Sequence, residues 1–306
     1  MNQLKIQKEK SIRIFLYMHC NYSCDYCSAY RVFNTPLNYK YKTMIVDEWL
    51  TGINNPTLTQ RYVDDYGLIL SGGEPTLYKG FVDLINNIDE KRKIYVYSNI
   101  SEFAYNKLMQ LKRSVILYPS FHIKIELKQN GASAYKIWFE RLLDLKEKDH
   151  TIHMTHTPDD GTNGIDDLPT GIIRTNIEGY WNDVYHSPYV NECRVNGEEI
   201  KKVDCLTVQP QVVSDGTIFN CQAGAWSNRK NLILGNIKNM NWGELPDWLT
   251  CKQCGKCHIC SQGKVIRDFE TKEIYLDKWQ YMPVLNPAGY QLAATESKNN
   301  RGQYNQ

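Results

Sequence analysis

Ten cysteines fall into two groups whose spacing suits metal binding. Cys20, Cys24 and Cys27 form a C-x3-C-x2-C run, and no cysteine lies between residues 28 and 192. The other seven are Cys193, Cys205, Cys221, Cys251, Cys254, Cys257 and Cys260. Disulfide frameworks are typical of short secreted chains with evenly spread cysteines. Because these cysteines are clustered and no signal peptide precedes them, the pattern indicates metal or iron–sulfur sites.

The N-terminal triplet supplies three thiolates, one fewer than a four-iron cubane needs for full protein ligation. A cluster held by Cys20, Cys24 and Cys27 would therefore keep one iron open to a small molecule. Zinc is the alternative, but a structural zinc site usually takes four protein ligands. His19 is the only nearby candidate, and its place next to Cys20 in the chain is poor for joining the same site. We therefore predict a [4Fe–4S] cluster on the triplet.

The elements around the triplet follow an alternating pattern. Apolar runs predict strands at 12–17, 68–70 and 94–97, an extended segment at 115–127, and two further strands at 152–155 and 172–174. Apolar residues at helical spacing predict helices at 45–53, 81–88, 104–111 and 135–145. Strands alternating with helices imply a parallel sheet with right-handed crossovers. The triplet then lies at the C-terminal end of the first strand, where such folds place their chemistry.

Composition limits the class of protein. The chain has 306 residues, 42% hydrophobic and 23% charged, which indicates a folded globular protein. A net charge of +2 gives no electrostatic case for nucleic acid. No apolar run reaches the roughly 18 residues that a membrane span needs. We expect a cytoplasmic protein with no nucleic acid and no membrane partner.

A second motif follows the second predicted strand. Gly72-Gly73-Glu74-Pro75 continues from Leu70-Ser71, and glycines there allow the backbone to approach a ligand closely. Alone, the segment is equally typical of a simple turn at a strand end. Together with the cysteine triplet it resembles the radical S-adenosylmethionine (radical SAM) superfamily over about residues 11–175. Tyr26 matches the aromatic residue that commonly precedes the third cysteine of that family.

The resemblance implies several cofactor contacts. In the family, the segment matched by Gly72, Gly73, Glu74 and Pro75 receives the amino group of the methionine moiety. Ser98-Asn99, at the end of the third strand, resembles the position that contacts the ribose, although Ser-Asn is also ordinary turn material. Ser120 and His122 resemble a fourth-strand segment that often faces the cofactor, and His122 fits a hydrogen-bonded core histidine equally well.

The resemblance also implies a fold and a mechanism. The fold would be α/β, a partial parallel (β/α)6-type radical SAM barrel. S-adenosylmethionine would chelate the open iron, and one electron would cleave it to methionine and a 5′-deoxyadenosyl radical that abstracts hydrogen from the substrate. A flavodoxin- or ferredoxin-type protein would supply the electron. The sequence identifies no general acid or base.

The C-terminal cysteines resemble a Twitch/SPASM auxiliary-cluster domain. Cys205, Gly216 and Cys221 form C-x10-G-x4-C, and Asp215-Gly216 between β-forming residues predicts a hairpin that brings Cys221 towards Cys205. The run from Cys251 to Cys260 departs from the usual SPASM spacing. One or two auxiliary [4Fe–4S] clusters fit the count, and a zinc ribbon on the final run is the alternative.

We favour two auxiliary clusters. Cys193, Cys205 and Cys221 would hold one of them with a single cysteine of the final run, and the other three cysteines of that run would hold the second. Leaving three crowded thiols unused would expose them to oxidation.

The expected organisation has three parts. Residues 1–185 form the radical SAM core, residues 186–285 a small cysteine-rich α+β auxiliary domain, and residues 286–306 a tail. The expected function is an oxidoreductase that modifies a peptide or small-molecule substrate. The alternative is a non-catalytic iron–sulfur or zinc protein for electron transfer or partner binding, which would have no use for a Gly-Gly-Glu-Pro segment.

Overall fold

The computed structural model describes the first half of the chain almost continuously and the second half in shorter stretches. The described residues are 9–24, 27, 42–156, 173–176, 179–181, 184–186, 194–195, 198–199, 203–206, 210–226, 228, 230–246, 248–251, 265–268, 270–271 and 274–276. Tyr26, Cys193, Cys254, Cys257 and Cys260 lie outside them. The predictions made for those five residues therefore stay predictions.

A nine-stranded sheet forms the centre of the molecule. Strands β1 to β6 lie side by side in chain order, and every neighbouring pair among them is parallel. Their bounds are β1 (Glu9–Tyr17), β2 (Tyr62–Gly72), β3 (Lys93–Ser98), β4 (Ile116–Pro119), β5 (Thr151–His156) and β6 (Ile173–Asn176). Because helices occupy the connections from β1 to β5, the predicted partial parallel barrel is confirmed.

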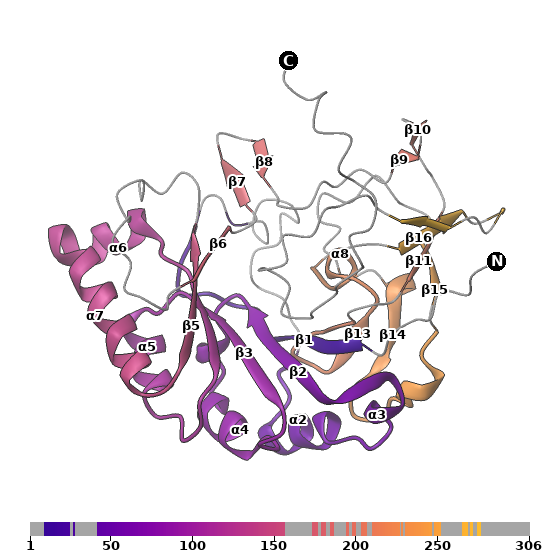
Figure 1. The fold of residues 1–306 in the computed structure, drawn as a ribbon, viewed down its shortest axis with the longest axis horizontal. Helices are drawn as coiled ribbons and strands as arrows, with labels where there is room; N and C mark the ends of the chain where they lie inside the picture. Colours follow the sequence, from indigo (N-terminus) through magenta and orange to yellow (C-terminus); the bar gives the residue numbers. More distant parts are fainter. Residues whose placement is uncertain are drawn as a thin grey trace.

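The helices cover the outer face of this curved sheet (Figure 1). They are α2 (Val46–Ile53), α3 (Leu58–Arg61), α4 (Phe81–Asn87), α5 (Glu102–Leu108), α6 (Ile123–Asn130) and α7 (Ala134–Glu147). Alternate strand residues such as Ile12, Ile14 and Leu68 pack with helix residues such as Trp49 and Trp138 in one buried core. The intervening strand residues consequently face the other side of the sheet.

One predicted element was wrong in part. The extended segment expected at 115–127 is a strand only over Ile116–Pro119, and helix α6 begins at Ile123. The alternation of Ile123 and Ile125 with polar residues imitates a strand. Pro119 ends β4, and the following Glu-Leu-Lys-Gln residues are good helix formers, which explains the outcome.

The sheet continues on the far side of β1. Strands β12 (Gln211–Val212), β13 (Thr217–Phe219) and β14 (Ile233–Asn236) extend it, with β12 parallel to β1 and the other two antiparallel. The predicted hairpin around Gly216 is confirmed, and the positive φ of +84° at Gly216 is the conformation that glycine tolerates.

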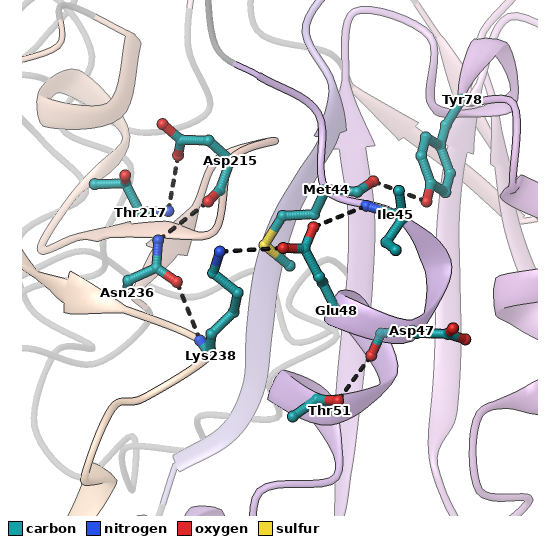
Figure 2. A network of polar contacts seen from close by, with 10 residues as sticks. All are labelled: Met44, Ile45, Asp47, Glu48, Thr51, Tyr78, Asp215, Thr217, Asn236 and Lys238. Carbon is teal, nitrogen blue, oxygen red and sulfur yellow. Dashed lines mark hydrogen bonds and ion pairs between the residues drawn. The ribbon is translucent and has the colours of Figure 1, made fainter.

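Polar contacts join this extension to the start of α2. Lys238 Nζ lies 3.2 Å from Glu48 Oε1, and Glu48 also accepts from the Ile45 N–H (Figure 2). Residues that sequence analysis assigned to the C-terminal region thus complete the sheet that carries the N-terminal triplet. The predicted division into domains itself stays a prediction.

The remaining described strands are antiparallel. A four-stranded sheet has the order β15 (Trp248–Cys251), β11 (Val203–Leu206), β16 (Val265–Asp268), β17 (Ile274–Leu276). Two short pairs are β7 (Gly179–Trp181) with β8 (Val184–His186), and β9 (Arg194–Val195) with β10 (Glu198–Glu199). The 3-10 turn η4 (Trp242–Glu244) comes shortly before β15 in the chain. Within the described part of the chain, no helix has the length and apolarity to cross a membrane.

Candidate iron–sulfur and cofactor site

The cysteine triplet lies in the loop that follows β1, at the C-terminal end of the parallel strands. The side chains of Cys20, Cys24 and Cys27 are each partly buried. Burial raises the pKa of Cys20 to about 12, and the nearby carboxylate of Glu74 also raises it, whereas the Tyr22 N–H, which donates to the sulfur over 3.4 Å, lowers it. This sulfur therefore needs a cation to stay a thiolate, which is the condition that a metal cluster meets.

The Gly-Gly-Glu-Pro segment is paired directly with the cysteine loop. The Gly73 N–H donates to the Tyr17 carbonyl over 2.9 Å, and the Glu74 N–H donates to the His19 carbonyl over 2.8 Å. A Cβ on Gly73 would lie 2.2 Å from the His19 oxygen, and one on Gly72 would lie 2.3 Å from the Tyr17 oxygen. Both glycines are thus required by a backbone-to-backbone approach, which adds a structural reason to the ligand approach inferred from sequence.

Glu74 joins the ends of two strands. Its buried carboxylate accepts from the Thr76 N–H and hydroxyl, from the Ser98 hydroxyl, and from the Asn99 N–H at distances of 2.7 to 3.3 Å. Burial raises the pKa of Glu74, and these donors oppose the rise. Pro75 is also buried and opens the 3-10 turn η1 (Pro75–Leu77). The carboxylate therefore fixes the position of the loop after β2 against the end of β3.

Asn99 connects the end of β3 with the cysteine loop. Its side-chain amide donates to Asn21 Oδ1 over 2.7 Å and lies 3.8 Å from Cys20 Sγ. Asn21 in turn donates to Ser101 Oγ over 2.9 Å, and Ser101 caps helix α5. Sequence analysis missed Asn21 and Ser101, because neither belongs to a motif and only the fold brings them together.

His122 contacts the triplet as well. Its Nδ1 lies 3.4 Å from Cys24 Sγ, and its Nε2 lies 2.9 Å from Ser120 Oγ. Ser120 and His122 therefore lie beside the cysteine loop, together with Ser98 and Asn99. Both interpretations that the sequence left open for His122, a hydrogen-bonded core histidine and a position facing the cofactor, agree with these contacts and stay predictions.

A buried pair that sequence analysis also missed fixes the middle of the loop. Tyr22 donates a hydrogen bond to Glu126 of α6, and the Tyr22 ring packs edge-on against His122 with centroids 5.5 Å apart. Burial raises the pKa of both Tyr22 and Glu126, and their shared hydrogen bond raises that of Tyr22 further. The only signal in the sequence is the position of Tyr22 between two cysteines.

These residues fit a cubane cluster. N–H groups of Tyr22 and Asn99 point at Cys20 Sγ, and an imidazole nitrogen lies beside Cys24 Sγ, as expected around ligated sulfur. No group of three or more His, Cys, Asp or Glu residues within the described ranges converges on one metal ion. A cubane does not require such convergence, because each thiolate binds a different iron.

The described C-terminal cysteines lie in two places. Cys221 immediately precedes α8 (Gln222–Trp226) and packs against the apolar cluster around Phe15 and Phe219, as Cys27 does. Cys205 and Cys251 belong to the paired strands β11 and β15, where Cys205 is opposite Leu249 and Cys251 is opposite Val203. The assignment of these cysteines to particular clusters stays a prediction.

Comparisons with known proteins bear on this site. A family model described as a 4Fe–4S single cluster domain matches residues 10–138, which include the triplet and the Gly-Gly-Glu-Pro segment. No curated protein matches the chain. The expectation of a four-iron cluster in the N-terminal half is confirmed.

Solved structures show distant likeness. A structure described as native anSMEcpe with bound AdoMet is 15% identical, with a TM-score of 0.49, covering 77% of this chain and 80% of that one. A second, native anSMEcpe with bound AdoMet and Cp18Cys peptide, is 16% identical, with a TM-score of 0.47, covering 77% and 79%. BtrN in complex with AdoMet and 2-DOIA is 13% identical, with a TM-score of 0.44, covering 78% and 82%. Over residues 10–138 the chain is thus similar to a 4Fe–4S single cluster domain.

Proposed function

We propose that the protein is a radical SAM enzyme that reductively cleaves S-adenosylmethionine and abstracts a hydrogen atom from a peptide or small-molecule substrate. One observation carries the proposal: two backbone hydrogen bonds join the Gly-Gly-Glu-Pro segment to the loop that holds the cysteine triplet. A cluster carrier would need the cysteines alone. A methionine-binding segment built into the same loop pair serves an enzyme that brings a small molecule to the open iron.

The cysteines and the strand ends have distinct roles in this proposal. Cys20, Cys24 and Cys27 would hold the cluster through three thiolates and leave it one site for S-adenosylmethionine. When bound, the reduced cluster and S-adenosylmethionine supply a 5′-deoxyadenosyl radical for hydrogen abstraction. The protein orients these groups and excludes water from them.

Positioning is the role that the contacts support for Glu74. Its carboxylate is engaged by Thr76, Ser98 and Asn99, so we assign it to holding the loop and assign the methionine amino group to the segment's backbone. Ser98 and Asn99 lie at the end of β3 beside Cys20, which suits a ribose-binding position. Ser120 and His122 face the same loop from the end of β4.

The wider setting follows from the same proposal. One or two auxiliary clusters on the C-terminal cysteines would assist by binding the substrate or by accepting an electron from it. A flavodoxin- or ferredoxin-type protein would deliver the electron in the cytoplasm.

The decisive experiment measures 5′-deoxyadenosine. Anaerobically reconstituted protein is reduced with dithionite in the presence of S-adenosylmethionine, and the products are quantified by liquid chromatography with mass spectrometry. We expect reductant-dependent 5′-deoxyadenosine and an EPR spectrum of the reduced cluster that changes when S-adenosylmethionine is added. A fully loaded cluster that gives neither result would support the non-catalytic iron–sulfur protein instead.

A further inference from the structure

The inner face of the sheet carries an arginine that forms no ion pair among the residues that the structure describes. Ile12 and Ile14 of β1 pack into the core on the helix side, so Arg13 between them lies on the opposite face. Its guanidinium carbon lies 5.7 Å from the centre of the Tyr97 ring, and its Nη1 donates to Gln222 of α8 over 3.4 Å. Because Tyr97 is on β3, Arg13 reaches past β2 along the concave side of the sheet.

The hydrogen bonding of Arg13 is incomplete. Its Nε is buried and has no hydrogen-bond partner, and no ion pair with a carboxylate is formed among the described residues. Removing a guanidinium from water costs free energy when no counter-charge compensates for it. A buried N–H without a hydrogen-bond acceptor adds to that free-energy cost. Carboxylates and phosphates that bind an arginine side-on in a bidentate pair contact the edge of the guanidinium that carries Nε. The site is therefore complementary to an oxyanion.

Two more polar atoms on this face lack partners. Ser71 Oγ and His153 Nδ1 are both buried without a hydrogen bond. Ser71 follows Leu70 and His153 follows Ile152, and both of those neighbours belong to the core on the helix side. The unpartnered indole Nε1 atoms of Trp49, Trp138 and Trp242 belong to that core instead. Because buried polar groups are normally hydrogen-bonded, the three on the inner face indicate a polar ligand.

Aromatic rings connect these polar atoms. Tyr97 and Tyr118 stack with centroids 4.6 Å apart and an interplanar angle of 9°, and Tyr118 packs against His153 at 5.1 Å. Burial lowers the pKa of His153, which keeps the imidazole neutral near neutral pH. The rings of Tyr97, Tyr118 and His153 therefore form an aromatic row without charge from β3 to β5, and Arg13 lies beside it.

We propose that Arg13 binds an oxyanion of the substrate, a carboxylate or a phosphate ester, beside the stacked rings of Tyr97 and Tyr118. This inference rests on the proposed function, because it takes the inner face of the barrel as the substrate side. Arg13 pairs with Ile69, three residues before Gly72. At about 3.3 Å per residue, that is about 10 Å below the methionine segment, so the site is separate from the one for S-adenosylmethionine.

The test uses benzoate and phenyl phosphate as anionic probes and benzamide as the neutral probe of the same shape. Dissociation constants are measured by ligand-observed NMR on reconstituted protein with the cluster left oxidised. We expect at least one anion to bind wild type more tightly than benzamide, and the tighter anion identifies the substrate group. In Arg13→Gln its affinity should fall roughly tenfold or more, because the charge and the fork of donors are both lost.

The matched control is Arg92→Gln. Arg92 also stacks on a tyrosine, with its guanidinium carbon 3.9 Å from the centre of the Tyr66 ring, but it precedes β3 at the other end of the sheet. This variant should bind the probes as wild type does. If Arg13→Gln fails to fold, Arg13→Lys keeps the charge without the bidentate geometry and should give an intermediate affinity.

Three results would overturn the proposal: equal binding of benzamide and both anions to wild type, undiminished anion binding to Arg13→Gln, or displacement of the anion by saturating S-adenosylmethionine. The proposed function has its own readout, 5′-deoxyadenosine formed by wild type. Cleavage of S-adenosylmethionine without anion binding that depends on Arg13 would reject only this inference. Such binding without cleavage would reject only the radical SAM activity.

Discussion

The two cysteine-bearing regions are built on opposite strand arrangements. The N-terminal triplet occupies a loop at the C-terminal edge of parallel strands, where residues from the ends of β2, β3 and β4 meet it. Cys205 and Cys251 instead lie on the neighbouring antiparallel strands β11 and β15, which pair with each other along their length. A parallel sheet gathers distant segments at one edge, whereas an antiparallel pair joins segments along its length. The first arrangement suits a site that must also bind a small molecule.

The two regions also meet. Cys27 and Cys221 pack against the same apolar cluster, which includes Phe15 of β1 and Phe219 of β13. The hairpin at Gly216 thus brings Cys221 to the apolar cluster that also contacts Cys27, and its approach to Cys205 stays a prediction. The number and position of the auxiliary clusters therefore depend on which cysteine sulfurs bind the same cluster.

The largest expected effect separates the two regions by function. Replacing Cys20, Cys24 or Cys27 by alanine should abolish 5′-deoxyadenosine formation, because the cluster loses an iron ligand. The auxiliary iron should remain. With three cubanes of four irons each, wild type should hold about twelve irons and each variant about eight.

A control from the other region tests the same comparison. Cys251→Ala should lose C-terminal iron and retain the reduced-cluster EPR signal that responds to S-adenosylmethionine. Wild type with about eight irons and no zinc would favour a single auxiliary cluster. Zinc in place of the extra iron would mean that the final cysteine run is a structural metal site.

The second effect tests the close approach of two backbones. Gly73→Ala places a methyl group 2.2 Å from the His19 carbonyl oxygen, so the two loops must separate. We expect a loss of stability of about 3 kcal/mol and a strong loss of S-adenosylmethionine cleavage. Thermal unfolding and the 5′-deoxyadenosine assay provide the measurements.

Gly131→Ala is the matched control for that variant. A Cβ there meets no atom within 4 Å, and only the positive φ of +57° is unfavourable. It should cost about 1–2 kcal/mol and leave cleavage unchanged. Equal damage from both variants would mean that the contact with the His19 carbonyl has no special importance.

A smaller effect is expected from Glu74→Gln. In wild type the Ser98 hydroxyl and the Asn99 N–H both donate to the Glu74 carboxylate. The glutamine side chain would place its own N–H group against one of these donors. We expect destabilisation of about 2 kcal/mol, measured by thermal unfolding, together with slower cleavage. Glu48→Gln removes an exposed carboxylate that pairs with Lys238 and should leave the unfolding midpoint almost unchanged. A similar midpoint for both variants would contradict the role given to Glu74.

The smallest effect concerns His122. Hydrogen bonds to cluster sulfurs favour the reduced, more negative state, so His122→Ala should make the reduction potential of the N-terminal cluster more negative. A bond that favours the reduced state by about 1 kcal/mol corresponds to about 40 mV. An EPR-monitored redox titration measures it. His150→Ala removes a buried imidazole at the opposite end of β4 and should leave the potential unchanged; an equal shift in both would exclude a local effect of His122.

The sequence by itself determined the iron–sulfur chemistry, the order of strands and helices in the first half, and the hairpin at Gly216. These depend on local signals: ligand spacing, apolar periodicity and the Asp-Gly turn. The failure at 115–127 has a local cause too, because an alternating run such as Ile123 to Leu127 fits a strand or a helix until the chain context decides.

Only the tertiary structure decided which side chains meet at the site. Asn21, Ser101 and Glu126 belong to no motif. Asn21 is part of the cysteine loop, and Ser101 and Glu126 contact that loop because parallel strand ends converge there. Likewise, β12 pairs with β1 across about 200 residues of sequence, a long-range pairing that no local pattern specifies. The setting of Arg13 is also decided by the tertiary structure, since a sequence shows that an arginine is present and only the fold shows that no carboxylate among the described residues pairs with it.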